Sequence, residues 1–428
     1  MPAKKKTVPP TTRYRVVEIC AGAGGQALGL EKAGFEHELA IELDRNACDT
    51  LELNRPGWKV AWGDVANPET WNPSDYAGID LLAGGVPCPP FSIAGKQLGA
   101  SDERDLFAWA VETAVQIKPR ALMLENVRGL SAPRFAAYRQ RILDRLTEAG
   151  YVADWRLLQA SDFGVPQLRP RFVLVALQRE DAAYFHWPKP TPTKKTVGTA
   201  LKDLMGQEGW RHLDDWVKLA NDIAPTLVGG SKKHGGADLG PTRAKRAWLN
   251  LGVSGMGIAN EVPAKDSPHP LDAPPKLTIP MVARLQGWKD GEWKFAGLKT
   301  ATYRQIGNAF PPPVAQAIGT SIIAAFNRTA KRRDIPELAD SAVHDSVYRA
   351  LQSTDGFMTA KRLLAISEDI AEEHELERRI ADLSRDFEVE IKQNKTGVSY
   401  RLGEFKGFVG QEDHHRHEYI ADYRSRVS

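Results

Sequence analysis

The sequence predicts an α/β fold in which a doubly wound, parallel sheet is covered by helices on both faces. From Arg13 to about Leu177, short β-rich runs alternate with helical patterns, which is typical of parallel sheets. The chain of 428 residues is 42% hydrophobic and 26% charged, as in globular proteins that bury a large core. The alternation stops near His186, loop-rich sequence follows to about Lys276, and helical segments then restore regular structure.

The predicted elements follow one another along the first part of the chain. "YRVVEICAG" predicts a strand entering a glycine turn, and "QALGLEKAGF" predicts the helix after it. "HELAIELD" and "NACDTLELNRP" are the next strand and helix. "IDLLAGG", "RALMLENV" and "RFVLVAL" are further buried strands, with helices such as "LFAWAVETAVQIK" between them. The expected divisions are a disordered basic tail (1–12), the α/β domain (13–185), the insert (186–276), the return to the α/β domain (277–330), a mostly helical C-terminal domain (336–405) and a polar tail (406–428).

Charge and cysteine content exclude several classes of protein. The net charge of +3 is too small to indicate nucleic-acid binding, so any basic footprint must be local. Three cysteines, Cys20, Cys48 and Cys88, cannot form a disulfide framework, and this number fits a reducing compartment. No apolar run of membrane-spanning length and no signal-peptide pattern is recognised, so no membrane association is expected.

Acidic residues accompany the glycine turn "EICAGAGG", residues 18–25. Glycines let backbone N–H groups approach a ligand, and the following helix N-terminus favours negative charge. Glu42 ends the second strand, where doubly wound folds hold a ribose hydroxyl, and Asp64 follows the third. A turn of this kind can also be a plain tight connection, but with the two acids it indicates a nucleoside-type cofactor. The spacing alone does not separate NAD from S-adenosylmethionine.

A cysteine stands among prolines in "GGVPCPPFS", just after a predicted strand. Cys88 is either a small buried hydrophobe or a nucleophile, and a stiff loop beside a nucleoside site favours the nucleophile. Glu125 ends another strand in "ENV", and "QLRPR" places Arg169 and Arg171, together with Gln167, just before "RFVLVAL". A thiolate, a carboxylic acid and two guanidiniums suit attack on a ring made electron-poor by protonation.

These motifs together resemble the ordered motifs of DNA cytosine-5 methyltransferases. The resemblance covers about residues 14–327 and rests on "EICAGAGG", "IELD", "GDV", "GGVPCPPFS", "ENV", "QLRPRF", "RLQGW" and "YRQIGNAFPPP". Two departures are visible: Glu18 and Cys20 stand where Asp and Phe are more usual, and "NAF" replaces the commoner "NSV". The resemblance implies the class I S-adenosylmethionine-dependent methyltransferase fold.

The resemblance also implies roles for individual residues. Cys88 would add to carbon-6 of a flipped cytosine, Glu125 would protonate the ring nitrogen, and Arg171, with Arg169, would bind the carbonyl oxygen of the base. S-adenosylmethionine would be the cofactor, with its ribose hydroxyls on Glu42 and its adenine amine near Asp64. The expected cofactor contacts are Cys20, Ala21, Gly22, Gly24, Gly25, Glu42, Leu43, Asp64, Val65, Pro87, Asn308 and Ala309.

Residues 186–276 lie where this family has its target-recognition domain. Basic residues gather there in glycine-rich sequence that can enter a major groove, although a solvated loop is the alternative. They are Lys232, Lys233, His234, Arg243, Lys245 and Arg246; of these, Lys232, Lys233, Arg243 and Arg246, together with Ser92 and Gln97, are the expected DNA contacts. His234 has no cysteine or histidine at metal-binding spacing, so no metal site is expected.

The C-terminal part predicts a helix, a short helix capped by Thr359, a long helix and a hairpin turning at "NKTG". This order resembles a winged-helix module, with Arg378, Arg379 and Arg385 on its third helix. We expect Arg378 and Arg379 to contact DNA, and the alternative is a dimerisation or packing element.

The expected protein is the modification enzyme of a prokaryotic restriction–modification system. It would act in the cytoplasm as a monomer on double-stranded DNA, beside a separately encoded cognate endonuclease. The alternatives are an RNA cytosine methyltransferase and a non-catalytic DNA-binding protein on the same scaffold.

Overall fold

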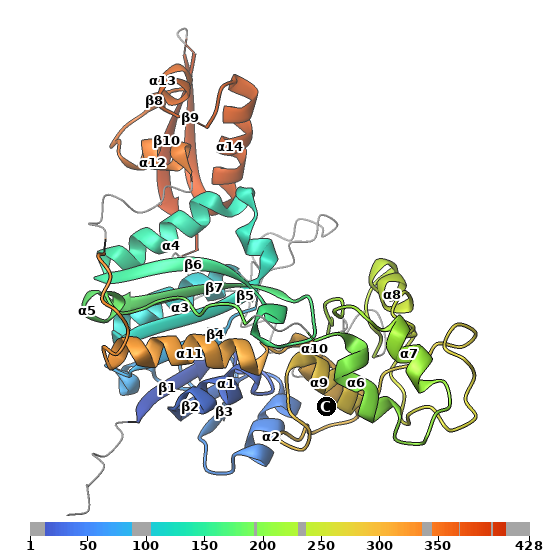
Figure 1. The fold of residues 1–428 in the computed structure, drawn as a ribbon. Helices are drawn as coiled ribbons and strands as arrows, with labels where there is room; N and C mark the ends of the chain where they lie inside the picture. Colours follow the sequence, from blue (N-terminus) through green and yellow to red (C-terminus); the bar gives the residue numbers. More distant parts are fainter. Residues whose placement is uncertain are drawn as a thin grey trace, which may run out of the picture.

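A seven-stranded sheet forms the centre of the molecule (Figure 1). The computed structural model describes residues 13–87, 104–191, 195–229, 237–335, 345–367, 369–394 and 397–407. The strand order is β3-β2-β1-β4-β5-β7-β6. The strands are β1 (Tyr14–Ile19), β2 (Phe35–Glu42), β3 (Val60–Trp62), β4 (Leu81–Gly85), β5 (Ala121–Val127), β6 (Tyr151–Gln159) and β7 (Pro170–Gln178).

Both faces of this sheet are buried, as the sequence predicted. Alternate residues of β5 point to opposite sides: Leu122 and Leu124 join one apolar cluster, whereas Met123 joins another. The helices of this domain are α1 (Gly25–Ala33), α2 (Arg45–Asn54), α3 (Arg104–Ile117), α4 (Ala136–Glu148), α5 (Arg179–Ala182), α10 (Lys299–Asn308) and α11 (Pro312–Phe326). Helix α11, far along the chain, packs along α1, and this contact returns the chain to the domain after the insert (Figure 1).

The expectation that every strand is parallel is wrong for β7. Strand β7 pairs antiparallel with both β5 and β6, and β6 itself was not predicted. The reason is that a short connection, rather than a crossover helix, joins β6 to β7, so the chain reverses direction. Arg171, at the start of β7, therefore lies opposite Val127, at the end of β5.

Residues 299–326 have the length and apolarity of a membrane-spanning helix, which was not predicted from the sequence. They form two helices, α10 and α11, with Pro311 between them. Helix α11 lies in the core against α1, with Ile318 and Ile322 fully buried. Packing within the protein therefore accounts for the apolar character of this segment.

The inserted module lies beside the ends of the central strands of the sheet (Figure 1). It contains α6 (Val197–Met205), α7 (Leu213–Leu219) and α8 (Thr242–Leu249), and α9 (Ile279–Gln286) leads back to the α/β domain. Its apolar cluster is built around buried Trp210, Trp216 and Trp248 and extends to Leu28 of α1.

The C-terminal module stacks on α4, away from the inserted module (Figure 1). It consists of α12 (Ser346–Gln352), β8 (Met358–Thr359), α13 (Ala360–Ile366), α14 (Glu373–Asp386), β9 (Phe387–Asn394) and β10 (Gly397–Phe405). This order agrees with the predicted one except for β8, which was not predicted, and the Thr359 hydroxyl accepts a hydrogen bond from the Arg362 N–H at the start of α13. The likeness to a winged-helix module stays a prediction.

Candidate active site

A cavity of about 320 Å³ opens where the glycine turn, β2, β3, β4 and β5 end. Its volume suits a nucleoside-sized ligand. The expected cofactor residues that line it are Cys20, Ala21, Gly22, Gly25, Glu42, Leu43, Asp64, Val65, Pro87, Asn308 and Ala309. The cavity thus brings together residues from the first 87 positions and from the return segment.

Gly24 is the one expected cofactor residue that does not line the cavity. Its φ of 84° lies in the left-handed region, and a Cβ there would lie 2.5 Å from the ring of Trp293. The Trp293 indole N–H donates to the Ala23 carbonyl at 2.9 Å. Gly24 therefore serves the turn and its packing against Trp293.

The Glu42 carboxylate is held by the backbone at the end of β2. The Gly22 N–H donates to one oxygen at 2.7 Å and the Asp44 N–H to the other at 2.8 Å. Burial raises the pKa of this carboxyl, although the backbone donors act in the opposite direction. Because each carboxylate oxygen has two lone pairs, Glu42 can still accept hydrogen bonds from a diol.

Asp64 is buried just beyond β3, and one of its oxygens accepts a hydrogen bond from the Ala66 N–H at 3.0 Å. The bond orients a carboxylate that lines the same cavity as Glu42. The two strand-end acids are therefore on one cavity, as the sequence predicted.

Several cavity residues were not predicted from the sequence. Glu18 is fully buried, and one of its oxygens lies at hydrogen-bonding distance, 2.8 Å, from His37 Nε2. Arg304 and Gln305 line the cavity from α10, and Gln26 lines it from α1. The spacing in "YRQIGNAF" could have predicted Arg304, because this residue precedes the predicted cofactor residue Asn308 by one helical turn.

Glu125 and Arg171 form a buried ion pair at the end of β5. Arg171 Nε lies 2.5 Å from a Glu125 oxygen, and each residue is 8% exposed. Burial raises the pKa of Glu125, and the opposing charge of Arg171 is the smaller influence. Burial likewise lowers the pKa of Arg171. Glu125 also lines the cavity, so a carboxyl that holds its proton to higher pH than usual faces the ligand site.

Arg169 is directed toward the backbone of other segments. Its guanidinium donates to the carbonyls of Leu227 at 2.6 Å, Gly307 at 2.7 Å and Ala309 at 3.0 Å, and the residue is 1% exposed. Gln167 similarly accepts from the Leu227 N–H and donates to Gln286. These two side chains join the start of β7 to the inserted module and to α10.

Some predicted residues lie outside the described part of the chain, namely Cys88, Ser92, Gln97, Lys232, Lys233 and His234. Pro87, which precedes Cys88, lines the cavity, as does Gly85. Gly85 pairs with Glu125 in the parallel ladder of β4 and β5. The described chain therefore reaches Pro87 on the cavity that the Glu125 carboxyl group also lines.

The predicted DNA-binding arginines differ in their surroundings. Arg243 and Arg246 are exposed on α8. On α14, Arg378 is exposed, whereas Arg379 forms ion pairs with Asp345 at 3.1 Å and Asp369 at 3.0 Å. Arg379 is thus held within the C-terminal module.

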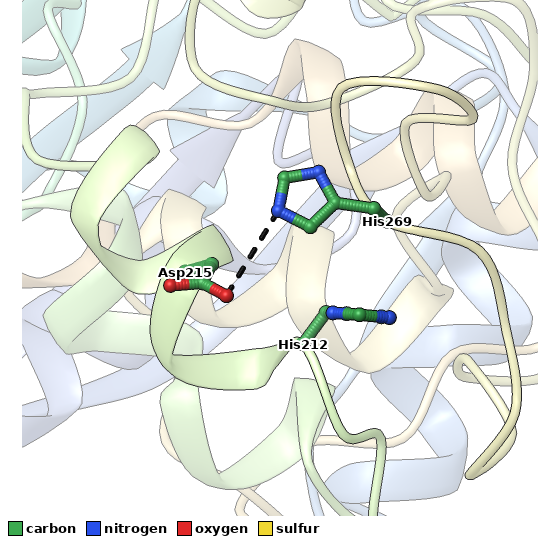
Figure 2. A group of neighbouring side chains, drawn as sticks. All are labelled: His212, Asp215 and His269. Carbon is green, nitrogen blue, oxygen red and sulfur yellow. Dashed lines mark ion pairs between the residues drawn. The ribbon is translucent and has the colours of Figure 1, made fainter.

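Figure 2 shows His212, Asp215 and His269, whose nitrogen and oxygen atoms lie within 4.8 Å of one another. His269 Nε2 is 3.9 Å from Asp215, whereas tetrahedral zinc ligands lie roughly 3.4 Å apart. The Leu271 N–H donates to His269 Nδ1 at 3.3 Å, which leaves the proton of the neutral ring on Nε2. Lys218 also pairs with Asp215. We therefore assign no metal to this group.

Residues 14–324 match the family model described as C-5 cytosine-specific DNA methylase. The chain is 62% identical over 413 residues to the Type II methyltransferase M.NaeI of Lentzea aerocolonigenes, covering 96% of this chain and 99% of that protein. It is 49% identical to the Type II methyltransferase M.NgoMIV of Neisseria gonorrhoeae, covering 74% of this chain and 99% of that protein. A crystal structure of a Spodoptera frugiperda DNMT2 mutant shares the fold, with a TM-score of 0.52 and 15% identity over 72% of this chain and 99% of that one.

Proposed function

Because this chain belongs to the C-5 cytosine-specific DNA methylases, we propose that it methylates carbon-5 of one cytosine within a specific duplex sequence. It is a DNA cytosine-5 methyltransferase. The proposal is that it acts at one cytosine of a specific duplex sequence and that the residues have the roles given below. The observation that supports it best is the Glu125–Arg171 pair, which borders the same cavity as the strand-end acids and Pro87.

The cavity fits S-adenosylmethionine, which would supply an electrophilic methyl group. Glu42 would accept hydrogen bonds from the ribose hydroxyls, since its lone pairs exceed the backbone donors already present. Asp64 would accept from the adenine amine. Asn308 and Ala309 would close the cavity from α10.

The Cys88 thiolate would add to carbon-6 of the cytosine, which makes carbon-5 nucleophilic. Glu125 would donate its proton to the ring nitrogen, and Arg171 would hold Glu125 and the base carbonyl in place. After methyl transfer, loss of the carbon-5 proton and release of the thiolate would restore the enzyme. The base must leave the stack for this attack, because carbon-6 is inaccessible in a duplex.

Arg169 fits a positioning role better than base contact. Its donors are directed to three backbone carbonyls, those of Leu227, Gly307 and Ala309. We infer that it fixes the inserted module and α10 relative to the catalytic edge.

The inserted module would read the DNA sequence through Arg243, Arg246 and the glycine-rich residues before them. The relatives named above are Type II methyltransferases. By analogy the chain would protect DNA from a separately encoded endonuclease in a prokaryotic cytoplasm, acting as a monomer.

Covalent trapping tests the mechanism. In the presence of S-adenosylmethionine, duplex with 5-fluorocytosine at the target should form a stable adduct with the wild-type enzyme and none with Cys88→Ser, because carbon-5 carries fluorine in place of the proton whose loss releases the thiolate. Bisulfite sequencing of DNA from expressing cells identifies the target beforehand. An active wild-type enzyme that gives no adduct would rule out the thiol mechanism.

The pH dependence tests the role of Glu125. Since burial raises its pKa, the rate of methyl transfer should fall as pH rises through that value and the proton is lost. Glu125→Gln should lower the rate by roughly 100-fold or more and remove this alkaline fall. A variant that keeps the wild-type pH profile would assign the fall to another group.

A further inference from the structure

One face of α10 is directed to the cofactor cavity. Ala301, Arg304 and Asn308 all line it, and their spacing of three and four residues places them on the same side of a helix. Gln305 lines it as well. Among the lining residues that the structure describes, Arg304 is the only lysine or arginine, whereas five are acidic: Glu18, Glu42, Asp44, Asp64 and Glu125.

One donor of the Arg304 guanidinium lacks a hydrogen-bond acceptor. Its Nε is buried and has no hydrogen-bond partner in the structure. A buried donor without an acceptor costs free energy, so such a group calls for an acceptor. Arginine suits carboxylates in particular, because its planar donors match two oxygens.

The acids that line the cavity already form a hydrogen bond or an ion pair with another group. Glu18 pairs with His37, and Glu125 pairs with Arg171. The Glu42 oxygens accept from backbone N–H groups, and Asp44 caps α2 by accepting from the Asn46 N–H. None of these contacts supplies an acceptor for Arg304.

The glycine turn connects the two ends of the cavity. Gly22 donates to Glu42 at one end of the turn, and at the other a Cβ on Gly25 would lie 3.0 Å from that of Ala309, next to α10. A ligand with its ribose on Glu42 that extends along this turn brings its far end to α10. In S-adenosylmethionine that end is an amino acid.

We propose that Arg304 binds the carboxylate of the methionine part of S-adenosylmethionine and so selects cofactors that have it. This rests on the proposed function, because it takes the cavity as the cofactor site. Arg304 is a positioning residue for the amino-acid end of the cofactor and takes no part in proton transfer.

The test compares two ligands of the full-length protein by calorimetry. S-adenosylhomocysteine has the carboxylate, and its decarboxylated analogue keeps the amine and lacks only that group. The wild type should prefer S-adenosylhomocysteine. Arg304→Met should weaken S-adenosylhomocysteine by roughly 10-fold or more and leave the analogue nearly unchanged, since a charged hydrogen bond is lost. Arg304→Lys should recover part of the preference.

The outcomes separate the inference from the proposed function. A wild-type protein that binds neither ligand would overturn both. An Arg304→Met protein that keeps the full wild-type preference would overturn the inference alone. If that variant instead weakens only DNA binding and makes its salt dependence shallower by about one unit, Arg304 contacts a phosphate. Retained binding of the analogue shows that the variant is folded.

Discussion

The inserted module is joined to the catalytic domain by buried hydrogen bonds near the cavity as well as by apolar packing, whereas the C-terminal module is joined mainly by aromatic packing on α4. Arg169 and Gln167 make the first connection. In the second, the Phe405 ring lies 5.5 Å from that of Tyr138, and the Tyr348 hydroxyl donates to Asp144 at 3.0 Å. The two additions also lie at different sides of the sheet (Figure 1).

The difference indicates what each connection does. Directional hydrogen bonds to specific carbonyls set the position of the inserted module next to the cavity. Apolar packing is less directional and contributes mainly stability. Changes at the first connection should therefore alter activity and stability together, and changes at the second should alter stability alone.

The largest effect is expected from Arg169→Met. The carbonyls of Leu227, Gly307 and Ala309 lose their donor, at about 1–3 kcal/mol for each unsatisfied group. The free energy of unfolding should fall by more than about 3 kcal/mol, and S-adenosylhomocysteine should bind more weakly. Urea denaturation and ligand titration measure the two effects. Arg156→Met, on the exposed side of β6, is the control, and equal effects of the two changes would contradict the role of Arg169.

Phe405→Ala should reduce stability without changing the site. The ring is buried and lies 5.0 Å from that of Phe387 and 5.5 Å from that of Tyr138. Its removal should cost roughly 3 kcal/mol, and the KM for the cofactor should not change. Phe405→Leu should cost less. A change in KM similar to that of Arg169→Met would remove the distinction between the two connections.

Arg349→Ala tests the polar part of the C-terminal contact. Arg349 pairs with Asp144 at 3.1 Å, and the Asp144 side chain is only 12% exposed. The loss should be about 1 kcal/mol, because the arginine is partly solvated. A double-mutant cycle with Asp144→Asn measures the pair directly, and Arg141→Ala is the control. A coupling energy near zero would mean that the Arg349–Asp144 pair does not stabilise the contact and that aromatic packing alone joins the C-terminal module to α4.

The smallest effects concern DNA affinity. Arg246→Ala in the inserted module should make the salt dependence of DNA binding shallower by about one unit. Arg379→Ala should change it little, since Asp345 and Asp369 already neutralise that guanidinium. Arg378→Ala tests the exposed neighbour on α14. A full unit of change for Arg378 and none for Arg246 would reverse the assignment of the DNA-reading module.

Much of the site could be predicted from the sequence because the motifs lie at strand ends. Glu42, Asp64 and Glu125 end or follow parallel strands, and the carboxyl ends of such strands share one edge of the sheet. Periodicity and motif order therefore sufficed to group these residues with the glycine turn, and the cavity contains all of them. The element order of the C-terminal module was also predictable, since its helices and hairpin are local patterns.

Only the tertiary structure decided how distant segments meet. The reversed direction of β7 pairs Arg171 with Glu125, and local periodicity does not encode strand direction. Arg169 and Arg171 are two residues apart in one motif, yet one holds backbone carbonyls and the other a carboxylate. Their different roles depend on which segments pack beside each side chain, and long-range packing determines those neighbours.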